Sequence, residues 1–157
     1  MTGKTIVAYF SAEGKTEQFA RALAEAAHAE LFAIVPELPY TAADLKWTNP
    51  LARCNREKIG KKDVPIRNTI ERWEEYDVVF LGFPIWYYGA PNVVNTFCKA
   101  YDWSGKKLYL FATSGGSGIG KTAEKLQPCL NGNPELLGAE VYQSVDKLTK
   151  DAARLLG

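Results

Sequence analysis

The sequence holds few of the side chains that bind metals or form disulfides. Its 157 residues include one histidine and three cysteines, Cys54, Cys98 and Cys129, with no C-x-x-C pair. An odd number of widely spaced cysteines argues against a disulfide scaffold and a structural zinc site, and a reducing compartment fits best. His28 lies late on an expected helix, so a Ser-His-Asp triad has no plausible base near the expected loops.

Long runs of one charge or of apolar residues are also missing. Lys and Arg number 19 against 18 Asp and Glu, a net charge of +1, so neither nucleic acid nor an anionic membrane is favoured as a partner. No apolar stretch reaches the 18 residues or so of a membrane span, and the first apolar run is too short for a signal peptide. We therefore expect a cytoplasmic protein.

Apolar residues make up 46% of the chain, enough for a real core, and we expect one domain over residues 1–157. Strands are predicted at 5–10, 29–35, 77–84, 107–113 and 139–145. Helices are predicted at 16–28, 66–76, 90–101, 121–130 and 147–156, with Cys98 in the core. This alternation predicts an α/β fold in which helices cover both faces of a parallel, doubly wound sheet. Residues 40–62 show no clear period.

A short polar loop separates the first strand from the first helix. It consists of Ser11, Ala12, Glu13, Gly14, Lys15 and Thr16. Hydroxyl groups, a glycine hinge and the start of a helix bring backbone N–H groups and a positive dipole end to one spot, where a phosphate binds well. We expect this loop to hold a phosphate.

Two further loops follow the third and fourth strands. In an open α/β sheet, ligands bind beyond the carboxyl ends of the strands, so these loops should lie beside the first. One is aromatic and consists of Pro84, Ile85, Trp86, Tyr87, Tyr88 and Gly89. The other is rich in glycine and hydroxyl groups and consists of Thr113, Ser114, Gly115, Gly116, Ser117 and Gly118. Together the three loops predict a pocket for a flat ring that carries a phosphate.

A second phosphate-binding pattern overlaps the third loop. Residues 115–122 fit G-x-x-x-x-G-K-T, the pattern of nucleotide hydrolases. Only 35 residues follow Thr122, however, and no predicted strand ends in the Asp that would hold magnesium. We expect Lys121 and Thr122 to begin a helix instead.

The chain resembles the flavodoxin-like family over nearly its whole length. Ser11, Gly14 and Thr16 match the family's phosphate loop, and Trp86 matches its Trp after the third strand. The resemblance implies the strand order 2-1-3-4-5 and FMN as cofactor, with the phosphate on the first loop and the isoalloxazine ring between the other two. The chain departs from the family at Glu13, which replaces a hydroxyl residue, and at Tyr87, which replaces a glycine.

The resemblance implies a redox role in one of two forms. The first is an FMN-binding electron-transfer protein, with a reductase and an acceptor as partners. The alternative is an FMN-dependent NAD(P)H:quinone or flavin reductase acting on a small quinone, and either could be a monomer or a homodimer. A flavin-free signalling domain of this fold would need acidic residues at the strand ends, where this chain has Ser, Pro and Thr. Neither redox form needs an acid–base side chain, since the flavin itself carries the chemistry.

Overall fold

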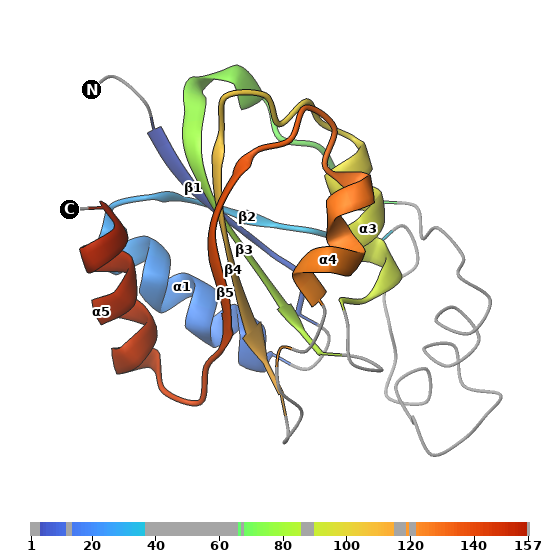
Figure 1. Cartoon of the computed structure of the whole chain (residues 1–157). Helices are drawn as coiled ribbons and strands as arrows, with labels where there is room; N and C mark the ends of the chain where they lie inside the picture. The colour runs from blue at the N-terminus through green and yellow to red at the C-terminus, as the bar shows by residue number, and fades with distance from the viewer. Residues whose placement is uncertain are drawn as a thin grey trace, which may run out of the picture.

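The protein is a five-stranded parallel sheet with helices on both faces (Figure 1). A computed structural model describes residues 4–11, 14–36, 66, 68–85, 90–114, 119 and 122–156. The strands are β1 (Lys4–Tyr9), β2 (Glu30–Ala33), β3 (Tyr76–Pro84), β4 (Lys107–Thr113) and β5 (Glu135–Val141). Their order in the sheet is β2-β1-β3-β4-β5, which confirms the predicted fold and strand order.

The described helices form two layers. Helices α1 (Lys15–Ala27) and α5 (Val145–Leu156) cover one face, while α3 (Asn92–Lys99) and α4 (Thr122–Leu126) cover the other (Figure 1). Two short 3-10 helices, η2 (Trp73–Glu75) and η3 (Gln127–Cys129), complete the elements of the described residues. None of the described helices is both long and apolar enough to cross a membrane.

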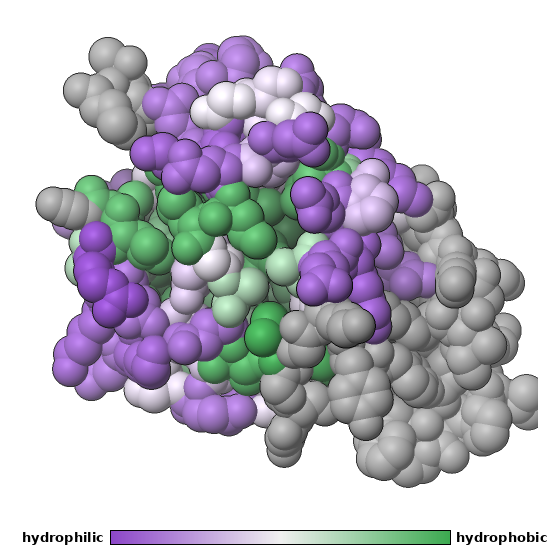
Figure 2. Space-filling view, in the orientation of Figure 1, coloured by the Kyte–Doolittle hydropathy of each residue, from purple (hydrophilic) through white to green (hydrophobic). Residues whose placement is uncertain are grey.

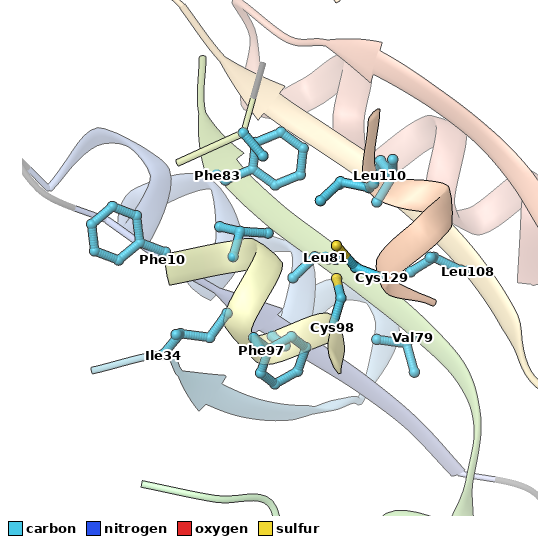
Figure 3. Close-up of a cluster of buried hydrophobic side chains, with 14 of the residues drawn as sticks. Phe10, Ile34, Val79, Leu81, Phe83, Phe97, Cys98, Leu108, Leu110 and Cys129 are labelled. Carbon is cyan, nitrogen blue, oxygen red and sulfur yellow. The ribbon is translucent and has the colours of Figure 1, made fainter. Parts of the chain in front are cut away.

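Alternate residues of β3 and β4 fill two cores. Val79, Leu81 and Phe83 point toward α3, whereas Val78 and Phe80 point toward α1. Because both strands are buried on both faces, their sequences read as continuous apolar runs. Figure 3 shows the core on the α3 side of the sheet, where the thiols of Cys98 and Cys129 lie near one another between α3 and η3. Burial confirms the expected core position of Cys98 and raises the pKa of its thiol.

The helix predicted over residues 66–76 is wrong. In the described part of this segment, only Trp73–Glu75 is helical, and Ile66 forms an isolated bridge with Pro36. Ile66, Ile70 and Trp73 still pack against the core, so their spacing reported burial correctly. The apolar residues reach the core from an irregular segment instead of a helix.

Tertiary hydrogen bonds take the place of helical ones in this segment. The Asn68 side chain accepts from the backbone N–H of Val35 at 3.2 Å and donates to the carbonyl of Ala33 at 2.7 Å, capping the end of β2. The backbone N–H of Ile70 donates to the Tyr101 hydroxyl at 2.8 Å. These partners lie more than 30 residues away in sequence, which is why local spacing could not reveal them.

Strand β5 lies earlier in the chain than the predicted 139–145 and forms one edge of the sheet. Its pairing with β4 begins where Lys107 faces Glu135, and the register shifts between Leu108 and Tyr109. Figure 2 shows a hydrophobic band over β5 between the hydrophilic surfaces of α4 and α5. Leu136 is 46% exposed there. The register shift is a β-bulge that interrupts this edge strand, and such a bulge opposes pairing with further strands.

A buried polar network holds α5 against the sheet. The hydroxyls of Tyr109 and Tyr142 are 2.5 Å apart, and the Tyr142 hydroxyl donates to Asp151 at 2.6 Å. Lys147 bonds the same carboxylate at 3.0 Å, and Arg154 lies 3.4 Å from its other oxygen. The Tyr142 hydroxyl first, and then Lys147, hold the pKa of Asp151 below its usual value.

We expect this network to make stability depend on pH in acid. A carboxyl whose pKa is lowered by folding stabilises the protein above its unfolded pKa of about 4, and this contribution is lost as the pH falls through the folded pKa. Asp151→Asn should therefore be less stable than the wild type at pH 7, with the gap narrowing below about pH 4. Urea midpoints at pH 7, 5 and 3.5 measure it. A gap independent of pH would contradict the assignment, and Asp146→Asn on the exposed side of α5 is the matched control.

Candidate functional site

The carboxyl ends of β1, β3 and β4 gather at one edge of the sheet, together with the start of α1 (Figure 1). The turn from β1 to α1 passes through Gly14, whose φ of 97° is in the left-handed region that favours glycine. Its backbone N–H donates to the Ser11 hydroxyl oxygen at 3.0 Å. The glycine and the serine thus close the turn and set the direction in which α1 begins.

The first turn of α1 presents unused backbone donors at this edge. The first helical hydrogen bond runs from the N–H of Gln18 to the carbonyl of Gly14, at 3.1 Å. Within the described residues, the N–H groups of Lys15, Thr16 and Glu17 have no acceptor. Free N–H groups and the positive end of a 13-residue helix favour an anion at this position.

A buried pair of hydroxyls lies behind these donors. The Thr16 side chain on α1 and the Thr113 side chain at the end of β4 are both 2% exposed, and their hydroxyl oxygens are 2.7 Å apart. Neither hydroxyl has another partner in the described part of the chain. Each carries one hydrogen, so their mutual bond uses one of two and leaves the other for an acceptor at the site.

The ends of β3 and β4 are joined at the same point. Pro84 and Thr113 are register partners, and the N–H of Ile85 donates to the Thr113 carbonyl at 2.9 Å. The chain beyond Thr113 is held by Gln143, whose side-chain amide donates to the Ser114 carbonyl at 3.2 Å. The aromatic and glycine-rich loops therefore begin from one hydrogen-bonded junction, and Thr16, at the end of the first loop, contacts it through the Thr113 hydroxyl.

The structure brings together those predicted site residues that it describes. They are Ser11, Gly14, Lys15, Thr16, Pro84, Ile85, Thr113 and Ser114. The other predicted members lie outside the described residues: Ala12, Glu13, Trp86, Tyr87, Tyr88, Gly89, Gly115, Gly116, Ser117 and Gly118. For these the sequence prediction stands as a prediction.

Sequence reasoning did not single out Asn92, the first residue of α3, which is 7% exposed and lies three residues after the aromatic loop. A polar side chain following Pro91 at the start of a helix was the only signal for it.

Thr122 does begin a helix, as predicted, and its hydroxyl donates to the Ile119 carbonyl. That bond uses the hydroxyl hydrogen of Thr122, the last residue of the second phosphate-binding pattern.

The acidic residue in the first turn of α1 is paired with a basic one. Glu17, in the first turn, forms an ion pair with Arg21 at 2.8 Å, one helical turn away. Burial first, and then the Glu17 carboxylate, raise the pKa of Tyr9, which therefore stays neutral under the adjacent helix. Among the described residues of this turn, the Arg21 guanidinium thus offsets the Glu17 carboxylate, which would otherwise repel an anion.

Other features of the described structure do not suggest a competing site. A cavity of about 330 Å³ lies between the C-terminal ends of α1 and α5, at the opposite edge of the sheet. It is lined by Ala26, Ala27, Thr149, Ala152, Ala153 and Leu156. Among the described residues, no group of three or more His, Cys, Asp or Glu side chains could hold a metal ion. The junction of the three loops is therefore the candidate site.

Comparison with solved structures finds similar chains. A "putative flavoprotein" from Bacteroides eggerthii is 38% identical, with a TM-score of 0.86 over 97% of this chain and 96% of that one. Another from Bacteroides uniformis is 37% identical, with a TM-score of 0.83 over 98% and 99%. A flavoprotein from Lactobacillus acidophilus, solved in complex with FMN, shares the fold at 21% identity, with a TM-score of 0.73 over 96% and 99%.

The family comparison covers almost the whole chain. No curated protein matches the sequence. The family model described as flavodoxin matches residues 4–151, which include all five strands and the described residues of the loop junction. This chain therefore belongs to the flavodoxin family.

Proposed function

We propose that this protein binds FMN and transfers electrons through it. The observation that carries the proposal is the β1–α1 junction, where three N–H groups without an acceptor among the described residues converge with a buried hydroxyl pair. Family membership and the FMN complex of the Lactobacillus acidophilus protein support the same assignment. The phosphate would accept hydrogen bonds from the N–H groups of Lys15, Thr16 and Glu17 and from one threonine hydroxyl.

The isoalloxazine ring would extend from the phosphate toward the ends of β3 and β4. On this side the described structure offers Ile85, which is half-buried, and the backbone of Ser114. The predicted ring contacts are the aromatic segment Trp86, Tyr87 and Tyr88 and the glycine-rich segment 115–118. A bound flavin supplies one- and two-electron redox chemistry, and the protein tunes it through stacking and hydrogen bonds. The chain's own residues bind, orient and shield the ring.

Two redox roles remain consistent with this site. A carrier would exchange electrons with a reductase and an acceptor protein, whereas a reductase would oxidise NAD(P)H and reduce a small quinone or flavin. Redox proteins usually dock rapidly through complementary charge, so a strongly acidic surface would favour the carrier role. The net charge of +1 does not provide such a surface, and this favours the reductase role. We propose the carrier role first. In either role the protein would act as a monomer or as a homodimer.

Titration of the flavin-free protein with FMN tests the binding proposal. We expect one FMN per chain, with quenching of flavin fluorescence as the ring stacks on aromatic side chains. Thr16→Val, which keeps the shape of the residue but removes its hydroxyl, should weaken binding about tenfold, as expected for loss of a hydrogen bond to a charged group. Thr149→Val, which removes a hydroxyl on α5, is the control. Absence of any FMN binding by the folded wild type would refute the proposal.

Rapid mixing of the FMN-loaded protein with NADPH separates the two roles. Direct bleaching of the flavin absorbance at a catalytically useful rate favours the reductase. Bleaching that requires an added reductase protein favours the carrier.

A further inference from the structure

Thr113 lies at the end of β4, outside the phosphate loop, yet its hydroxyl is hydrogen-bonded to that of Thr16 within the loop. We infer that Thr113 is a positioning residue that directs the Thr16 hydroxyl toward the cofactor phosphate and ties phosphate binding to the two ring loops. This inference rests on the proposed binding of FMN. It assigns Thr113 a part in recognising the phosphate, although it belongs to a different loop.

The hydrogen-bond inventory of the pair sets the direction of the bond. A hydroxyl has one donor and two acceptor sites, so the pair can be satisfied only if one hydroxyl donates to the other and the second donates elsewhere. Thr16 lies in the first turn of α1 beside the free N–H groups, whereas Thr113 lies at the end of β4. With an anion at the helix start, Thr113 donates to Thr16, and Thr16 donates to the anion. Thr113 thereby fixes the hydroxyl rotor of Thr16.

Packing alone does not explain two hydroxyls at this position. The pair connects α1 to β4 between residues 97 positions apart in sequence, and both side chains are 2% exposed. Two valines would fill nearly the same volume without a buried polar group, whereas a buried hydroxyl hydrogen left without an acceptor destabilises a protein. A bound phosphate oxygen supplies the acceptor that the described chain lacks.

Thr113 also connects the phosphate position to both ring loops. Its side chain contacts Thr16, its carbonyl accepts from the N–H of Ile85 at 2.9 Å, and its chain continues directly into Ser114. The first contact belongs to the phosphate loop, the second to the aromatic loop and the third to the glycine-rich loop. A shift of Thr113 on phosphate binding would therefore be felt at the start of both ring loops.

The test compares FMN with riboflavin, which has the same ring but no phosphate. Thr113→Val should raise the Kd for FMN about tenfold and leave the Kd for riboflavin within about twofold of the wild type. Thr113→Ser, which restores the hydroxyl, should bind FMN within about threefold of the wild type. Because Thr113 acts through Thr16, the double variant Thr16→Val/Thr113→Val should bind FMN about as weakly as Thr16→Val alone.

Each other result overturns the inference or separates it from the proposed function. An equal loss of FMN and riboflavin affinity in Thr113→Val, or additive losses in the double variant, would show that Thr113 only supports the fold. An unchanged FMN affinity would exclude any role in recognising the phosphate. If Thr113→Val does not fold, the smaller Thr113→Ala is judged by the same ratio of the two Kd values. Failure of the wild type to bind either flavin would instead refute the proposed function.

Discussion

Riboflavin is expected to bind this protein at least about 100-fold more weakly than FMN. The two ligands share the ring and the ribityl chain, so the difference isolates the phosphate at the β1–α1 junction. Three N–H groups and a threonine hydroxyl there have no acceptor in the part of the chain that the structure describes. A hydrogen bond to a charged group contributes roughly 1.5–3 kcal/mol, so two well-formed bonds already correspond to about 100-fold.

Fluorescence titration of the flavin-free protein with each ligand measures this ratio. Inorganic phosphate added at millimolar concentration should compete with FMN but not with riboflavin, because only FMN uses the junction. Raising the salt concentration should weaken FMN binding modestly, since part of the attraction comes from the helix dipole. Equal affinity for the two flavins would mean that the phosphate is bound elsewhere or not at all.

Gly82→Ala is expected to reduce the free energy of unfolding by about 3 kcal/mol. Gly82 lies in β3, where a Cβ would press against the Cζ, Cε1 and Cε2 atoms of the Phe111 ring on the neighbouring β4. Phe111 is fully buried and belongs to the core under α1 and α5, so its ring has little room to move. Inserting a methyl group into such a core costs about 1–3 kcal/mol, and the closeness of three ring carbons places this site at the upper end.

Denaturation of Gly82→Ala in urea measures the loss. Phe111→Leu, which removes part of the obstructing ring, supplies the matched background. If the clash is the cause, Gly82→Ala should cost clearly less in Phe111→Leu than in the wild type. Equal costs in both backgrounds would point instead to backbone or strand-propensity effects at position 82.

The sequence reported the sheet well because burial leaves a direct pattern. The apolar runs of β3 and β4 predicted central strands, and Lys107–Thr113 was predicted with the observed bounds. The spacing of Phe19 and Leu23 predicted the buried face of α1. The prediction of a helix over 66–76 failed because apolar spacing indicates burial and does not by itself fix the backbone conformation. Its spacing reported which side chains are buried, but Asn68 and Tyr101 supply the hydrogen bonds that decided its backbone.

By itself, the sequence determined the fold class, the order of elements and which strand ends meet at the carboxyl edge of the sheet. These follow from apolar periodicity and the direction of parallel strands, both of which are local or topological properties. Only the tertiary structure decided that Thr16 and Thr113 share a hydrogen bond, that Ile85 joins the same junction, and that Gly82 must lack a side chain. Each of these depends on atoms that the chain separates by about 30 to 100 residues, so only packing of the finished sheet and helices brings them together.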